Sequence, residues 1–222
     1  MMPAANPSPP DLPGETSLAR ALAAIAPYGV HTGCRFIREG DETHLSPEEA
    51  RSIPARRPAM RRASGAARWI AHRLLADIGI KNVAIPRAPS GAPVWPDGTI
   101  GSLAHDDDMA VAAVARIGQI VSLGIDVEPA LPLPDDIFAL VATGADRMGS
   151  AGQRLAGRLL FAAKEAVYKA VYPLDHQVLG YEDIAVDLKA DRATTTTGRR
   201  VSLVYCTAPR VVVLGYVGGV ED

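Results

Sequence analysis

Cysteine is scarce in this sequence, since only Cys34 and Cys206 occur among its 222 residues. Two cysteines cannot build a disulfide framework, and these two lack the spacing of a zinc site. We therefore expect a reducing, cytoplasmic setting.

Net charge is also nearly absent, at −2, so the protein as a whole attracts neither nucleic acid nor an anionic membrane surface. Any charged partner must meet a local patch.

Long apolar runs are missing too. The longest candidate, residues 109–125, is interrupted by Arg116 and two glycines and falls short of the ~18 apolar residues that span a bilayer. The first fifteen residues contain five prolines and have neither the basic nor the apolar region of a signal peptide. We predict that residues 1–15 are a disordered lead-in and that the protein has no membrane association.

The apolar content, at 48%, is enough to fill the core of one large domain or two compact lobes. Helical spacing predicts helices at residues 16–26, 58–78 and 151–172, the last ended by Pro173. Strand patterns occur at residues 30–39, 100–104, 110–116, 119–129, 183–188, 199–206 and 210–217. No regular βαβ rhythm appears, so we predict an α+β fold with an N-terminal lobe (16–118) and a C-terminal lobe (119–222).

Two carboxylates follow an apolar strand in "GIDVEP", residues 124–129. Side chains two apart share a face of a strand, so Asp126 and Glu128 project together while Val127 points away. Neighbouring carboxylates repel each other unless a cation lies between them. Oxygen ligands favour magnesium or manganese over zinc. The alternative is that both acids are solvated at a wet strand end.

A second group of polar residues lies in "FAAKEAVYK", residues 161–169. Lys164, Glu165, Tyr168 and Lys169 are predicted to lie off the apolar stripe of this helix. Glu165 and Lys169 could form a solvated i,i+4 ion pair worth roughly 0.2–0.5 kcal/mol. Alternatively, Glu165 is a third carboxylate for a metal, and the lysines lie near a phosphate.

Seven arginines and no acid occur between Ala50 and Ala76. They are Arg51, Arg56, Arg57, Arg61, Arg62, Arg68 and Arg73. Such a cluster indicates an anion site or the solvated face of a helix. The planar guanidinium suits phosphate, and the only aromatic nearby is Trp69, so a phosphorylated small molecule or an acidic protein fits better than nucleic acid.

A Gly/Pro loop precedes His105 and three aspartates in residues 91–108. His105 is either an ordinary surface or core histidine that forms a hydrogen bond within the protein, or a residue that contacts an anion. The residues from Asp106 to Asp108 are interpreted as turn residues, because neighbouring side chains point apart and aspartate is common in turns.

Four segments together resemble one family, the 4'-phosphopantetheinyl transferases of the Sfp and EntD type. They are "RRASGAAR", "GAPVWPDGTIGSLAH", "GIDVEP" and "FAAKEAVYK". The resemblance covers about residues 50–185, and the second segment is most similar to the EntD-like actinobacterial branch. It implies two pseudo-symmetric α/β lobes with coenzyme A in the cleft between them, and a monomer.

The resemblance implies an activity as well. The enzyme would transfer 4'-phosphopantetheine from coenzyme A to a serine hydroxyl of an apo acyl- or peptidyl-carrier protein, releasing adenosine 3',5'-bisphosphate. Such proteins serve fatty-acid, polyketide, nonribosomal-peptide and siderophore synthesis. Asp126, Glu128 and Glu165 would hold Mg²⁺, with Mn²⁺ as a substitute. Glu165, directly or through a metal-bound water, would take the serine proton, and Lys169 would offset charge on the leaving phosphate.

Contacts to coenzyme A also follow from the resemblance. The residues implied are Arg61, Arg68, Arg87, Gly91, Pro93, His105, Lys164 and Lys169. Arg56, Arg57 and Arg62 are alternatives to Arg61, because the start of that helix lacks the family's usual aromatic. Two positions depart from the family: Ala92 replaces a common lysine, and Ala104 replaces a serine or threonine.

Two other functions fit parts of the sequence. A noncatalytic regulatory module could bind coenzyme A or a carrier protein without reaction, although it would not need the three acids. A magnesium phosphohydrolase could use the aspartates at 106–108.

Overall fold

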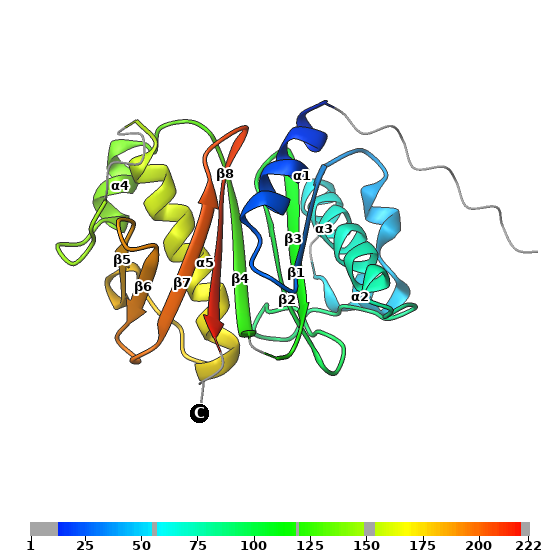
Figure 1. The fold of residues 1–222 in the computed structure, drawn as a ribbon. Coiled ribbons are helices and arrows are strands. Elements are labelled where there is room, and N and C mark those ends of the chain that lie inside the picture. Colours follow the sequence, from blue (N-terminus) through cyan, green and yellow to red (C-terminus); the bar gives the residue numbers. More distant parts are fainter. Residues whose placement is uncertain (1–12, 55–56, 119, 149–153, 219–222) are drawn as a thin grey trace, which may run out of the picture.

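The structure is a computed structural model that describes residues 13–54, 57–118, 120–148 and 154–218 (Figure 1). It has the predicted α+β fold, with two antiparallel sheets and helices packed against them. The first half of the chain contains α1 (Pro13–Ile25), β1 (Val30–Phe36), η1 (Asp41–His44), α2 (Pro47–Ser52), α3 (Pro58–Asp77), β2 (Thr99–His105) and β3 (Met109–Arg116). The second half contains β4 (Ile120–Pro129), α4 (Asp135–Val141), α5 (Ala156–Asp175), η2 (Tyr181–Asp183), β5 (Ile184–Asp187), β6 (Arg192–Thr195), β7 (Arg200–Cys206) and β8 (Arg210–Gly218).

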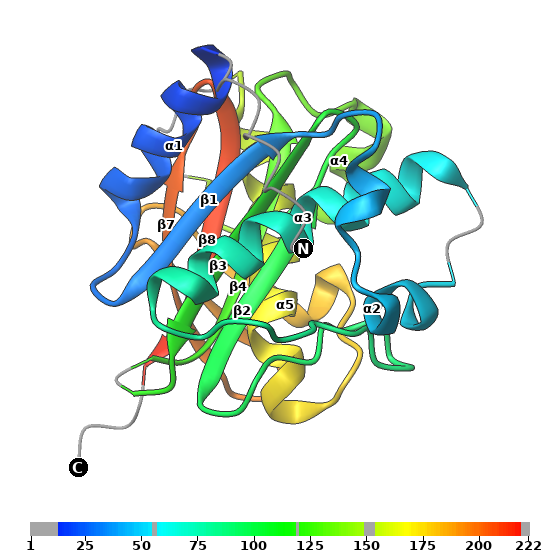
Figure 2. The same cartoon turned by 90° about the vertical axis from the view of Figure 1, so that its right-hand side faces the viewer.

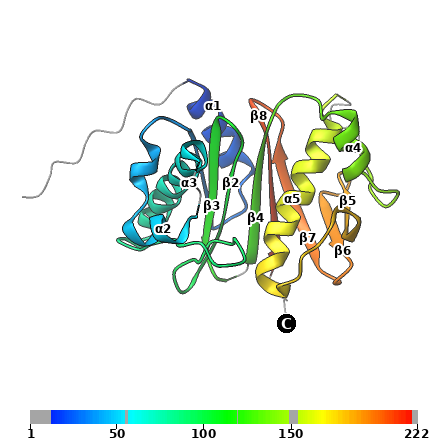
Figure 3. The same ribbon diagram turned by 180° about the vertical axis from the view of Figure 1, so that it is seen from behind.

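Each lobe combines one sheet with one helix of 20 residues. The N-terminal sheet has the strand order β1-β3-β2, and the C-terminal sheet has the order β4-β8-β7-β6-β5. The helices α3 and α5 lie on the same side of the molecule, and α1 lies on the other (Figures 2 and 3). The lobes meet where β2 lies beside β4.

Side chains alternate between the two faces of the central strand β3, so this strand contributes to two apolar clusters. On β3, Ala112 and Val114 pack under α3, whereas Val111 and Ala113 face the junction between the lobes. The junction also receives apolar side chains of α1, β4 and β8, which are Leu18, Leu22, Leu123, Ile125, Val127, Val212 and Leu214. The two lobes are therefore joined by a shared apolar core.

Small residues let α5 approach β4 very closely. A Cβ atom at Gly124 would lie 2.1 Å from the carbonyl oxygen of Ala166 and 2.5 Å from the nitrogen of Ala170. The hydroxyl of Ser122 donates a hydrogen bond of 2.5 Å to the carbonyl of Ala170. This contact fixes the height of α5 over the sheet.

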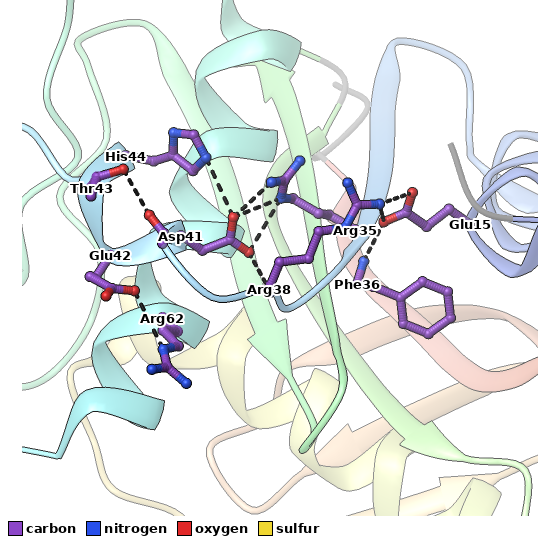
Figure 4. A network of polar contacts seen from close by, with 10 residues as sticks. Glu15, Arg35, Phe36, Arg38, Asp41, Glu42, Thr43, His44 and Arg62 are labelled. Atoms are coloured by element: carbon purple, nitrogen blue, oxygen red, sulfur yellow. Dashed lines mark hydrogen bonds and ion pairs between the residues drawn. The ribbon is translucent and has the colours of Figure 1, made fainter. Parts of the chain in front are cut away.

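An ionic network fastens the outer elements of the N-terminal lobe (Figure 4). Arg35 on β1 forms a buried ion pair of 2.7 Å with Asp41 of η1. Arg38 pairs with Glu15 of α1 at 2.8 Å. These pairs hold α1 and η1 against β1 and the residues that follow it.

Several predicted boundaries differ from the structure. The first helix begins at Pro13, so residues 13–15 are helical, while residues 1–12 lie outside the described part. The predicted helix start at 151–153 also lies outside it. Pro173 does not end α5, which continues two residues further to Asp175, although a proline lacks the backbone N–H and its ring crowds the carbonyl one turn earlier. The sequence did not predict α4 or β6.

Among the described residues, no helix combines the length and the apolar character needed to cross a bilayer. The α5 helix has the required length, with 20 residues, but it carries Arg158, Lys164, Glu165 and Lys169.

Replacing Gly124 by alanine tests the close approach of α5 and β4. We expect the free energy of unfolding to fall by about 1–3 kcal/mol, because the added methyl group meets backbone atoms that cannot move without shifting the helix. Urea denaturation measures the change. The matched control is Gly144→Ala, since a Cβ atom there meets no heavy atom within 4 Å. Equal stabilities of the two variants would contradict this account.

Candidate active site

A cavity of about 570 Å³, here called the interlobe cavity, opens between the two lobes. One wall comes from the loop before β2 and from β2 itself, including Arg87, Gly91 and Pro93. The opposite wall is the second half of α5, including Glu165 and Lys169. These five residues were all expected at the site, and they line one cavity although Arg87 and Glu165 are 78 residues apart in the sequence.

A second cavity of about 290 Å³, here called the smaller cavity, lies on the other side of Glu165. It is bounded by α5 and by residues 178–181 and Ile184. Glu165 and Tyr168 line both cavities, so these two side chains form the partition between them.

Asp126 lies on the face of β4 that is turned toward α5, as predicted, and Val127 packs into the core on the opposite face. Its Oδ1 accepts a hydrogen bond of 2.6 Å from Nζ of Lys169. The other oxygen, Oδ2, is buried and has no hydrogen-bond partner among the described residues. Burial raises the pKa of Asp126 to about 6, although Lys169 opposes the shift.

Glu128 is held by a different cation. Its Oε2 accepts a hydrogen bond of 2.7 Å from Nη1 of Arg158. The Nε and Nη2 atoms of Arg158 donate to the carbonyls of Leu131 at 3.2 Å and Pro132 at 3.0 Å. Burial raises the pKa of Glu128, and the hydrogen bond and charge of Arg158 oppose this effect. Arg158 thus joins the carboxylate to the segment after β4.

Glu165 accepts a hydrogen bond of 3.1 Å from the hydroxyl of Tyr181. Burial, followed by the charge of Glu165, raises the pKa of Tyr181 to about 12. The charges of Asp126 and Glu128 add to this shift. Glu165 is thus the acid that contacts this hydroxyl, and Asp126 and Glu128 act on it only through their charges.

The three acids do not form a ready-made metal cluster. Within the described part of the chain, no three acidic, histidine or cysteine side chains are close enough together to hold a metal ion. Asp126, Glu128 and Glu165 instead each have a separate partner. The donor set nevertheless fits a hard divalent cation, because its atoms are carboxylate oxygens and the buried Oδ2 of Asp126 is unsatisfied.

The expected phosphate contact of Lys164 is wrong. Lys164 is completely buried and forms an ion pair of 2.8 Å with Asp146. Its ammonium group also donates to the carbonyls of Val141 at 2.9 Å and Tyr181 at 2.8 Å. All three donors are used inside the C-terminal lobe, so Lys164 belongs to the buried side of α5 and not to its polar face.

Arg87 is the arginine that the structure places on the wall of the interlobe cavity. Its Nε donates to the carbonyl of Gly91 at 3.3 Å, and its backbone nitrogen donates to Ser52 Oγ at 2.9 Å. Two residues earlier, the nitrogen of Ile85 donates to the buried Glu49 at 2.8 Å. Helix α2 therefore fixes the loop that carries Arg87.

Of the other predicted arginines, those that the structure describes do not line this cavity. Arg68 is buried behind the loop and donates to the carbonyls of Ile85 at 2.8 Å and Ser64 at 3.4 Å. Arg61 donates to the carbonyl of Ala50 at 3.5 Å. Arg62 pairs with Glu42 at 3.5 Å, Arg57 precedes α3, and Arg56 lies outside the described residues.

His105 is exposed at the end of β2, with Nδ1 3.3 Å from the carbonyl of Asp106. Desolvation by its surroundings lowers the pKa of His105; the Asp106 carbonyl opposes this shift, and the charge of Lys169 adds to it. His105 is thus within electrostatic reach of Lys169, although it does not line the interlobe cavity.

The aspartates after His105 join the lobes. Asp106 and Asp108 both form ion pairs with Arg210, at the start of β8, and the second pair measures 3.1 Å. Oδ1 of Asp106 accepts hydrogen bonds from the nitrogens of Asp108 at 2.8 Å and Met109 at 2.7 Å, as expected for a turn. The carboxylates of Asp106 and Asp108 thus stabilise the turn after β2 and its contact with β8.

Sequence reasoning missed Arg158, Tyr181 and Trp95. Arg158 and Tyr181 bind the acids through contacts that span 30 and 16 residues, and no periodic pattern indicates such pairs. Trp95 lines the interlobe cavity against Gly101, where a Cβ atom would lie 2.4 Å from the indole ring. The "WPDG" segment is part of the family resemblance, but it did not predict that the side chain of Trp95 would line the cavity.

Comparison with known proteins gives consistent matches in both lobes. Residues 48–115 match the family described as the 4'-phosphopantetheinyl transferase N-terminal domain, and residues 122–214 match the 4'-phosphopantetheinyl transferase superfamily. The chain is 35% identical to 4'-phosphopantetheinyl transferase Svp of Streptomyces mobaraensis, over 79% of this chain and 74% of that protein. It is 34% identical to 4'-phosphopantetheinyl transferase Npt of Nocardia iowensis, over 80% and 81% of the two chains. It is 38% identical to 4'-phosphopantetheinyl transferase PptT of Mycobacterium tuberculosis, over 71% of each.

Replacing Lys164 by methionine tests its placement. We expect the free energy of unfolding to fall by about 3–5 kcal/mol, because Asp146 is left as a buried, unpaired charge. Urea denaturation measures this loss, and Lys189→Met on the exposed surface is the control. If Lys164 instead contacted a ligand phosphate, its variant would keep wild-type stability and lose only ligand affinity.

Proposed function

The chain belongs to the 4'-phosphopantetheinyl transferase family and is an enzyme of that class, and from this premise we propose its reaction and mechanism. It transfers the 4'-phosphopantetheine group of coenzyme A to a serine hydroxyl of an apo carrier protein and releases adenosine 3',5'-bisphosphate. The observation that carries this proposal is the interlobe cavity, which brings Arg87 opposite Glu165 and Lys169.

The walls of the interlobe cavity suit a nucleotide with several phosphates. Arg87 supplies a guanidinium, whose planar fork matches phosphate oxygens. Trp95 and Tyr172 supply aromatic surface in the same cavity. Ala92 contributes no cation, so Arg87 takes the part that a lysine at this position has in many relatives. Both walls come from one chain, so the site is complete in a monomer.

Asp126, Glu128 and Glu165 would hold a magnesium ion together with the diphosphate of coenzyme A. Bound there, the cation would neutralise charge on the phosphoryl group that is transferred. Asp126 already presents an unsatisfied oxygen, whereas Glu128 would exchange Arg158 for the new ligand.

The chain's own residues then perform positioning and proton transfer, which is what phosphoryl transfer mainly requires. Glu165 keeps one oxygen on Tyr181 and has the other available to accept the serine proton. Lys169 lies 2.6 Å from Asp126 and would offset the negative charge that builds on the leaving bisphosphate. His105 would contact a phosphate near Lys169.

The two rival functions have less support. A noncatalytic binding module has no use for the acids Glu165 and Asp126 together with Lys169 at a nucleotide-sized cavity. A phosphohydrolase that uses residues 106–108 would need carboxylates that are free to bind a metal, whereas Asp106 and Asp108 pair with Arg210.

Glu165→Gln tests the proposed base. We expect transfer to slow by about 10²–10⁴-fold, because the amide cannot accept the serine proton. The assay incubates the protein with coenzyme A, Mg²⁺ and an apo carrier protein and follows the mass gain of one phosphopantetheine. Glu182→Gln, on the exposed side of η2, should retain wild-type activity. A native rate in Glu165→Gln would eliminate this mechanism.

Metal removal tests the proposed cation. Chelation should abolish transfer, and Mg²⁺ should restore it, with Mn²⁺ restoring part of the rate, since both ions accept carboxylate and phosphate oxygens. Rescue by Zn²⁺ at the same concentration, or undiminished transfer in chelator, would contradict an oxygen-ligand site. The same mass assay provides the measurement.

A further inference from the structure

We infer that Tyr181 is a positioning residue for Glu165, which holds the carboxylate toward Asp126 and Glu128 in readiness for the reaction. The inference rests on the proposed function and assigns a part to a residue outside the acids and cations considered so far. Its basis is the hydrogen bond of 3.1 Å from the Tyr181 hydroxyl to Oε1 of Glu165.

Glu165 needs such a restraint because of where it lies. Its side chain borders both the interlobe cavity and the smaller cavity, so open space is available on two sides. A glutamate has three rotatable bonds, and fixing its side chain in one rotamer costs conformational entropy. Tyr181 provides that restraint from the smaller cavity, which it lines.

The contact between the two side chains suits a donor and an acceptor. The phenol hydroxyl of Tyr181 carries the proton and the carboxylate oxygen Oε1 of Glu165 accepts the hydrogen bond, over 3.1 Å. A hydrogen bond to a carboxylate is stronger than one between neutral groups.

Tyr181 is itself held from several directions. The buried Lys164 donates to its carbonyl at 2.8 Å and is fixed in turn by Asp146. The ring lies against Phe161 of α5, with 6.1 Å between the ring centres. The nitrogen of Gly180 donates to Asp183 at 2.9 Å. A rigid support of this kind is what lets one side chain orient another within a fraction of an ångström.

The test uses Tyr181→Phe, which removes one oxygen and keeps the ring that packs on Phe161. We expect kcat for carrier modification to fall by roughly tenfold, as for the loss of one hydrogen bond to a charged group, while KM for coenzyme A stays within about twofold. Mn²⁺ binding to the protein alone, followed by electron paramagnetic resonance, should weaken by several-fold, because Glu165 is less well placed.

The control is Tyr205→Phe, a half-buried tyrosine of β7 that lines neither cavity, and it should match the wild type in kcat, KM and Mn²⁺ affinity. Thermal denaturation of both variants checks that the fold is kept. The inference is overturned if Tyr181→Phe keeps both kcat and Mn²⁺ affinity, or if only KM for coenzyme A rises, which would make Tyr181 a direct ligand contact. A wild-type protein inactive on apo carriers would remove the proposed function instead, and Mn²⁺ binding would still decide the part of Tyr181.

Discussion

The close packing of α5 on β4 is the constraint on which the arrangement of the site depends. Gly124 has no side chain, so the backbone around Ala166 and Ala170 can come into direct contact with the strand. At that separation Lys169 of the helix reaches Asp126 of the strand, at 2.6 Å. A wider gap would leave the buried carboxylate of Asp126 without its partner Lys169, at a cost of several kcal/mol. The close packing of α5 on β4 and the ion pair between Lys169 and Asp126 therefore depend on each other.

Each acid of the site has a partner of its own before any ligand binds. Lys169 holds Asp126, Arg158 holds Glu128, and the neutral hydroxyl of Tyr181 holds Glu165. This division lowers the mutual repulsion of three carboxylates in one region. In the mechanism that we propose, ligand binding would exchange these partners: a cation and a diphosphate would bind the acids, and the displaced side-chain cations would be free to meet phosphate oxygens.

The parts of the site that the sequence predicted are those set by local periodicity. The alternation of a strand placed Asp126 and Glu128 on one face and Val127 on the other, and the structure agrees. Helical spacing placed Glu165 and Lys169 on one side of α5, and both line the interlobe cavity. Lys164 was misjudged because a lysine beside a glutamate usually faces water. Its partner, Asp146, lies in a loop that carries no pattern. The ion pair of Arg210 with Asp106 spans 104 residues, and only the topology of the sheets could reveal it.

The way in which the lobes are joined limits how the cleft can respond to a ligand. Ser102 on the cavity wall accepts a hydrogen bond of 3.0 Å from the nitrogen of Ile125, and Arg210 bridges to the turn after β2. Hinge opening would break these contacts and expose the shared apolar core, a cost that phosphate binding would have to repay. The loop from Arg87 to Trp95, which forms one cavity wall, is anchored at its start through Ser52, and Trp95 packs against Gly101 at its end. Contacts within one chain therefore hold both walls of the interlobe cavity in place, and these contacts keep Arg87 opposite Glu165 and Lys169.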